Sequence, residues 1–319
     1  MTQKRHQPEQ LGILLIDGFA MMSFACVIEP LRAANFLAGR ELYRWQLLAP
    51  DAASVSASNG IAMASQPLAA ATERFDTVLI CAAGNPTRFR HRATLAWLRR
   101  QAKGGARIGG VSGAPFVMAR AGLLAGRRAT IHWEHVPAFR EAFPDIDLRQ
   151  TLFEIDGDRM TCGGGVAALD LMHALIERDH GAALAAKVSD WFLQTEIRGG
   201  SGLQRLAPGP RQGSGDPRLS AAIAAIEVAP EGRVSRRALA ETAGLSQRQL
   251  ERLFVVGTGL PPAAFQRRQR LERAHVLLSQ SELSILEVAL ASGFATASHF
   301  SRAYRAQYGR PPSATRRGG

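Results

Sequence analysis

The 319-residue sequence has few of the residues that build disulfide or metal-bound scaffolds. It contains only three cysteines, Cys26, Cys81 and Cys162, which are far apart and form no CxxC pair. This number and spacing exclude a disulfide framework and a cysteine-based zinc site. We therefore expect reduced thiols, no bound metal and no cofactor.

Long hydrophobic runs are also absent. The first ten residues, MTQKRHQPEQ, are polar, and the apolar run from Leu11 to Ile16 is far too short to cross a bilayer. These features do not have the form of a signal peptide. We expect a soluble protein of the cytoplasm that is not associated with a membrane.

Lysine is nearly absent, since the chain has 36 arginines and only three lysines. This ratio is typical of a biased genome, but the distribution of the net charge of +12 is more informative. From Asp216 onward the chain carries 15 arginines, no lysine and eight acidic residues. A positive charge concentrated in this way favours polyanions, through phosphate contacts and counterion release.

The same pattern occurs twice near the C-terminus. The first copy, LAETAGLSQRQLERLFVVGTGLPP, runs from Leu239 to Pro262, and the second, VALASGFATASHFSRAYRAQYGRPP, runs from Val288 to Pro312. Each copy predicts a short helix, a turn with glycine and a second helix with an arginine-bearing face, which is the arrangement of a helix-turn-helix. The turn of the second copy is one residue longer. Two such units predict two recognition helices presented to one DNA duplex.

Each predicted recognition helix has an apolar face and a polar face. The apolar faces comprise Leu250, Leu253 and Phe254 in the first copy, and Phe300, Ala303 and Tyr304 in the second. The residues predicted to contact DNA are Gln247, Arg248, Glu251, Arg252, Thr296, Ser298, His299 and Arg302. Arginine can bond guanine through two hydrogen bonds, whereas Gln247 and Thr296 are better suited to phosphate contact or helix capping.

The region from Val234 to Arg316 resembles the DNA-binding domain of the AraC family of bacterial transcription regulators. The segment GFATASHFSRAYRAQYGRPPSATRR carries the likeness. One departure is Leu260, because the family more often has a small polar residue after the glycine. The resemblance implies operator DNA, RNA polymerase and a second copy of the chain as partners.

Composition also predicts the domain boundaries. A Gly-, Pro- and Ser-rich stretch, GGSGLQRLAPGPRQGSGDP, separates two regions of regular periodicity and predicts a linker. We assign a sensor and dimerisation domain to residues 10–197, a flexible linker to 198–217 and a DNA-binding domain to 218–316. The last domain is predicted to be all-helical, with a joining helix from Pro262 to Ser279.

The first domain alternates apolar strands and amphipathic helices. Strands are predicted at 11–16, 43–48, 77–80 and 107–111 and near Thr130 and Thr161; helices at 20–37, 87–103, 114–121 and 182–195; and a hairpin around Ser54 and Ile61. Strands and helices of these lengths predict an α/β domain of flavodoxin-like type, with a parallel sheet covered on both faces.

The order of a strand, GVSGAPFVMARAGLL and RRATIHWEH resembles the class I glutamine amidotransferase-like (PfpI-like) fold, in the GlxA-like version fused to AraC-type domains. Catalytic relatives have a cysteine at the tight turn between strand and helix, where this chain has Ser112. Ser23 stands where one branch of the superfamily has a supporting acid. The resemblance therefore implies a domain that has lost its chemistry.

A domain of this kind can still bind a ligand. Candidate effector-binding residues are Glu29, Ser112, Gly113, His132, Trp133 and Glu134. We expect the amides of Gly113, Ala114 and the run 163–165 to donate to a carboxylate, and Trp133 to face a cation. The sequence is similar to regulators that respond to glycine betaine, carnitine or arginine, which implies a small amine, betaine or amino-acid-like effector.

Three functions are compatible with these features. The first is a ligand-responsive transcription regulator, an activator of a catabolic operon, with no enzymatic activity. The second is an amidase or glyoxalase-like hydrolase with Ser112 as nucleophile, His132 as base and an appended DNA-binding domain, although no acid is evidently paired with His132. The third is an architectural DNA-binding protein whose first domain only dimerises.

Overall fold

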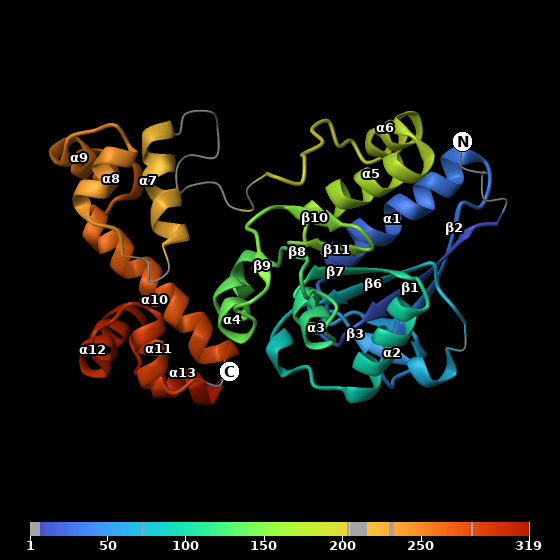
Figure 1. Ribbon diagram of the computed structural model, residues 1–319, viewed down its shortest axis with the longest axis horizontal. Coiled ribbons are helices and arrows are strands. Elements are labelled where there is room, and N and C mark those ends of the chain that lie inside the picture. The colour runs from blue at the N-terminus through green and yellow to red at the C-terminus, as the bar shows by residue number, and fades with distance from the viewer. Residues whose placement is uncertain are drawn as a thin grey trace. The chain divides into compact units, whose positions relative to one another are not determined.

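The computed structural model describes residues 7–71, 73–202, 204, 216–229, 233–281 and 283–318. The chain divides into two compact units, Met1–Gln204 and Arg205–Gly319 (Figure 1). Each unit has its own hydrophobic core and is described by itself below.

A seven-stranded sheet forms the centre of the first unit. All its neighbouring strands run parallel except β10, which is antiparallel to β11. Two pairs of short strands lie outside it, β3 (Ser54–Ser56) with β4 (Ala62–Ala64) and β8 (Arg128–Ala129) with β9 (Asp147–Leu148). In sheet order the seven strands are β10 (Phe153–Asp156), β11 (Arg159–Cys162), β7 (Arg107–Ser112), β6 (Thr77–Ala82), β1 (Glu9–Leu15), β2 (Tyr43–Ala49) and β5 (Gln66–Pro67).

Helices cover both faces of this sheet, as Figure 1 shows for α1, α5 and α6 on one side and α2 and α3 on the other. The side chains of β1 alternate between two cores: Ile13 and Leu15 pack with α1, α5 and α6, whereas Leu14 packs with α2, α3 and α4. The helices are α1 (Met21–Ala38), α2 (Arg92–Lys103), α3 (Ala114–Arg120), α4 (Val136–Ala142), α5 (Ala167–His180) and α6 (Ala182–Trp191), with the 3-10 turns η1 (Leu68–Ala70), η2 (Pro86–Arg88) and η3 (Trp133–His135). The predicted α/β fold is confirmed.

Four details of the prediction for this unit are wrong. Helix α2 begins at Arg92 and not at Thr87, because the His91 side chain caps it by accepting from the Thr94 amide. Helix α6 ends at Trp191, four residues before the predicted end. The strand predicted near Thr130 is only the two-residue β8, and the edge strand β10 was not predicted because its residues are all half-buried and lack a clear alternation.

The second unit is helical over its described residues, as predicted. It has two cores, one around α8 and α9 and one around α11 and α12, and α10 contributes Phe265 to the first and Leu271, Ala274, Leu277 and Leu278 to the second. These last four residues recur at helical spacing, so they lie on one side of the joining helix that was predicted from Pro262 to Ser279. The helices are α7 (Pro217–Val228), α8 (Arg236–Thr242), α9 (Gln247–Thr258), α10 (Pro262–Gln280), α11 (Ile285–Ala291), α12 (Ala297–Tyr308) and α13 (Pro312–Gly318).

The segment after α6 is bound to the first unit. Residues 194–202 and Gln204, which we call the tail segment, include Arg198, whose guanidinium pairs with the fully buried carboxylate of Asp170 at 2.6 Å. Gly200 accepts a hydrogen bond from the Leu152 amide. The linker predicted to start at residue 198 therefore begins with residues that make ordered contacts.

Candidate effector site and nucleic-acid interface

The two recognition helices, α9 and α12, are built alike. Helix α9 starts with a capping box formed by Ser246 and Gln249, and α12 starts with Thr296, whose hydroxyl accepts from the His299 amide. Each helix has 12 residues and ends at a glycine in the left-handed conformation, Gly259 or Gly309. Thr296 thus has the capping role that was predicted for it, whereas Ser246 caps the helix that contains Gln247.

The polar faces of these helices are open to solvent. Leu250 and Phe254 of α9 and Phe300 and Tyr304 of α12 are buried, while Leu253 and Ala303 are only partly buried. Glu251 is half-buried and pairs with Arg236 at 3.0 Å. The other seven predicted DNA-contacting residues are exposed: Gln247, Arg248, Arg252, Thr296, Ser298, His299 and Arg302.

In the first unit, Ser112 occupies the tight turn between β7 and α3. Its φ of +62° lies in the left-handed region, which among the described non-glycine residues is shared only by Leu193. The residue is 6% exposed. The turn predicted from the sequence is therefore present, with the backbone strain that is typical of such elbows.

Ser23 and the glycine run pack directly against Ser112. The Ser23 hydroxyl accepts a 2.8 Å hydrogen bond from the Gly165 amide. A Cβ placed on Gly164 would lie 2.6 Å from the Ser112 Cβ and 2.9 Å from the Ser23 Oγ. The structure thus brings together two serines, Ser23 and Ser112, that are far apart in the sequence.

Four of the five backbone amides that were predicted to donate to a carboxylate, those of Gly113 and of residues 163–165, are paired within the fold. Since buried amides need acceptors, the fold satisfies them internally. Gly113 donates to the Ala82 carbonyl at 2.8 Å, Gly163 to the Leu152 carbonyl at 2.9 Å, Gly164 to the Cys162 sulfur at 3.3 Å and Gly165 to Ser23.

His132 lies beside Ser112, because the His132 amide donates to the Ser112 carbonyl at 3.1 Å. Burial lowers the pKa of the imidazole, the nearby His135 lowers it further, and Glu134 partly opposes both effects. The ring is therefore neutral at pH 7. The Trp133 ring, 43% exposed, lies 5.2 Å from the His132 ring.

The arrangement offers only part of what catalysis needs. The acid beside His132 is Glu134, but its carboxylate is 3.9 Å from Nδ1 and half exposed, which is beyond hydrogen-bonding distance. Burial raises the pKa of Cys81 and of Cys162 to about 12, so both are neutral thiols and poor nucleophiles.

The expectation of no bound metal and the candidate effector residue Glu29 both concern groups that can carry charge. His132, Glu134 and His135 form a cluster whose ligand atoms lie within 4.8 Å of one another. Histidine nitrogens and carboxylate oxygens are ligands that zinc accepts in proteins, so these three residues are the candidate metal ligands among the described residues. Glu29 on α1 pairs with Arg32 at 2.7 Å, so its charge is already matched.

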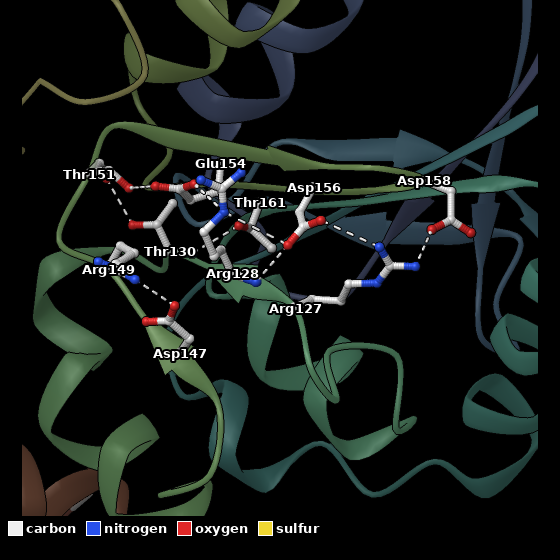
Figure 2. Close-up of polar contacts among 10 residues, drawn as sticks. All are labelled: Arg127, Arg128, Thr130, Asp147, Arg149, Thr151, Glu154, Asp156, Asp158 and Thr161. Carbon is white, nitrogen blue, oxygen red and sulfur yellow. Dashed lines mark hydrogen bonds and ion pairs between the residues drawn. The ribbon is translucent and has the colours of Figure 1, made fainter.

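Sequence reasoning missed Gln204, which it placed in the linker. The Gln204 Oε1 accepts from the Trp133 amide at 2.9 Å, and its Nε2 lies 2.7 to 3.0 Å from three oxygens. Two of these oxygens belong to Thr130 and Thr151, which Figure 2 shows side by side in a polar network with Glu154 and Thr161. No sequence signal distinguishes this glutamine from the polar residues around it. We call Ser23, Ser112, His132, Trp133, Gly164 and Gln204 the elbow cluster.

Comparison with known proteins assigns both units. Residues 12–178 match the DJ-1/PfpI family, and residues 239–318 match a helix-turn-helix domain. None of the described helices combines the length and apolar character that a membrane span requires.

The similarity to curated proteins extends over nearly the whole chain. The HTH-type transcriptional regulator GlxA of Rhizobium meliloti (strain 1021) is 44% identical over 97% of this chain and 96% of its own length. The HTH-type transcriptional regulator CdhR of Pseudomonas aeruginosa is 41% identical over 97% of this chain and 91% of its own length. Among solved structures, an AraC family transcriptional regulator from Pseudomonas putida covers 58% of this chain and all of its own, with 26% identity and a TM-score of 0.53. The chain therefore belongs to the AraC-type helix-turn-helix transcriptional regulators of the GlxA type, whose first domain has the DJ-1/PfpI fold.

Proposed function

We propose that this protein binds a specific operator through α9 and α12 and regulates transcription in response to a small effector held at the elbow cluster. The observation that carries the first half is the duplication of a capped, arginine-bearing helix with an open polar face. Two recognition helices in one unit suit two consecutive major-groove segments of one duplex, about one helical turn apart. Because their exposed residues differ, each helix reads its own half-sequence.

The proposed effector is a small amine, betaine or amino-acid-like molecule, the class that the family resemblance implies, and the residues around Ser112 support it. Trp133 offers a partly exposed aromatic surface, Glu134 an exposed carboxylate and His132 a neutral imidazole. The serine at the elbow and the absence of an acid bonded to His132 favour binding over turnover.

The protein acts as a homodimer and as an activator that contacts RNA polymerase. Dimerisation through the first unit is supported by apolar side chains left open on α1 and α6. Phe36 is 65% exposed and its ring lies 5.1 Å from that of Trp191, which is 46% exposed. Met22 of α1 is also exposed, and patches of this kind mark association surfaces.

Fluorescence anisotropy with the DNA upstream of the protein's own gene tests the DNA-binding function. We expect specific binding that weakens steeply with salt, and Arg252→Ala and Arg302→Ala each to reduce specific affinity by about 1 to 3 kcal/mol. Arg218→Ala on α7 is the matched control, because that arginine is paired with Asp216 outside both recognition helices. If both recognition-helix variants bind like the control, α9 and α12 are not the reading helices.

A further inference from the structure

The side chain of Gln204 occupies a polar site. The hydrogen-bonding groups of this site suit an ammonium and a carboxylate better than they suit an amide. The amide nitrogen lies 3.0 Å from Thr130 Oγ1, 2.9 Å from the Ile131 carbonyl and 2.7 Å from the Thr151 carbonyl. Its oxygen accepts from the Trp133 amide at 2.9 Å, so the oxygen and nitrogen of the side chain are assigned by their partners. Thr130 and Ile131 are fully buried.

Three acceptors around one nitrogen exceed what a primary amide can satisfy. An amide nitrogen carries two hydrogens, and Thr130 Oγ1 also donates its own hydrogen to the Thr151 carbonyl at 2.8 Å. An ammonium group carries three hydrogens and forms stronger, charge-assisted bonds. A quaternary ammonium carries none and could bond to none of the three oxygens.

The surroundings also suit a cation next to an acceptor. The Glu154 carboxylate, which is 13% exposed, accepts a hydrogen bond from the Thr151 hydroxyl at 2.8 Å. The nearest guanidinium nitrogen of Arg128 is 3.8 Å from this carboxylate. The Trp133 amide needs an acceptor close to that cation. The nitrogen and oxygen of Gln204 are joined through one carbon. An ammonium nitrogen and a carboxylate oxygen come closest to this spacing in an α-amino acid, where two carbons join them, and a β-amino acid adds one carbon more.

From this geometry we infer that Gln204 is a built-in substitute for the effector, and that the effector's ammonium and carboxylate displace it from Thr130, Ile131, Thr151 and Trp133. This inference rests on the proposed function and narrows its effector to a molecule with an α- or β-amino acid end. Gln204 is only half-buried, so a ligand reaches the acceptors from the surface.

Displacement has a mechanical consequence, because Gln204 is the last residue of the first unit and precedes the chain that leads to the DNA-binding unit. With Gln204 bound, the tail segment is held at both ends, at Arg198 by Asp170 and at Gln204 by the site. With the effector bound, the anchor at Gln204 is lost and the tail segment is held only through Arg198. The effector thus acts by releasing a restraint.

Calorimetric titration of the full chain tests the chemistry. The probes are L-alanine, L-arginine, L-glutamate and β-alanine, each paired with its N-trimethyl counterpart. We expect binding from at least one primary amine and none from its trimethyl partner. Gln204→Ala and the better space-filling Gln204→Met should each tighten that binding about tenfold, because no residue has to be displaced first. Thr130→Val should weaken it about tenfold. Gln194→Met is the control, since Gln194 lies on the same tail segment but bonds to Asp170.

Trypsin cleavage after Arg205 tests the mechanical part. The bound amine should speed cleavage in the wild-type chain, and Gln204→Met should be cut at the faster rate without ligand. Failure of every primary amine to bind Gln204→Met, equal binding of the trimethyl partners, or unchanged cleavage would overturn the inference. Such results leave operator binding by the ligand-free chain intact, whereas loss of operator binding refutes the proposed function and not this site.

Discussion

Substitution of Gly164 by alanine should damage the first unit through two separable effects. Gly164 has a φ of +83°, and an alanine in this left-handed region costs about 1 to 2 kcal/mol. The new Cβ would also lie 2.6 Å from the Ser112 Cβ and 3.0 Å from the Ser112 Cα. Because the Ser112 backbone is itself held at a φ of +62°, it cannot easily retreat, and overpacking adds about 1 to 3 kcal/mol. The expected loss is therefore about 2 to 5 kcal/mol.

Gly122→Ala supplies the matched control. Gly122 has a φ of +74°, but nothing lies within 4 Å of its added Cβ, so it should show only the backbone cost of about 1 to 2 kcal/mol. Urea unfolding followed by tryptophan fluorescence reports on the first unit alone, because all four tryptophans, at positions 45, 97, 133 and 191, lie in it. Equal losses in the two variants would refute the close packing of Gly164 against Ser112.

Two further predictions use the same assay. Arg198→Ala should lower the free energy of unfolding by about 3 kcal/mol, since it removes the charge partner of the fully buried Asp170 carboxylate. The control Arg32→Ala breaks only an exposed pair with Glu29 and should lower it by less than about 1 kcal/mol. Similar losses in the two variants would mean that the tail segment is not anchored at Asp170. His132→Gln should make the stability of the first unit less dependent on pH. Burial holds the pKa of His132 below its ordinary value in the folded chain. As pH falls below about 6.5, this histidine therefore takes up a proton in the unfolded chain before it does so in the folded chain, which favours unfolding. Between pH 7.5 and 5.5 the wild-type chain should lose more stability than the variant. A wild-type loss no larger than that of His132→Gln would contradict the lowered pKa.

Local sequence patterns were sufficient to predict the helices of the second unit. The helix-turn-helix units depend on residues a few positions apart, such as the caps Ser246 and Thr296 and the left-handed Gly259 and Gly309. The buried positions of α10 follow from helical periodicity in the same way. In the first unit the same kind of reasoning misplaced helix ends, as at Arg92, where a capping side chain decides the boundary, and missed the edge strand β10.

The candidate effector site could be predicted only in part. The dipeptide Ser112-Gly113 after an apolar strand predicts a tight turn, and His132 and Trp133 are recognisable by motif. The state of the backbone amides was not predictable, because the partner of Gly165 is the side chain of Ser23, 142 residues away. The role of Gln204 was equally hidden, since it depends on Trp133, 71 residues earlier in the chain.

The sequence alone thus determined that this chain has an α/β unit followed by two helix-turn-helix units, because strand, helix and turn preferences act over a few residues. Only the tertiary structure decided which polar groups remain available to a ligand. It paired the amides of the glycine run internally, and it placed Gln204 against three oxygens from separate positions of the chain. The physical reason is that a buried donor or acceptor must find a partner, and in a folded chain that partner can come from any distance in sequence.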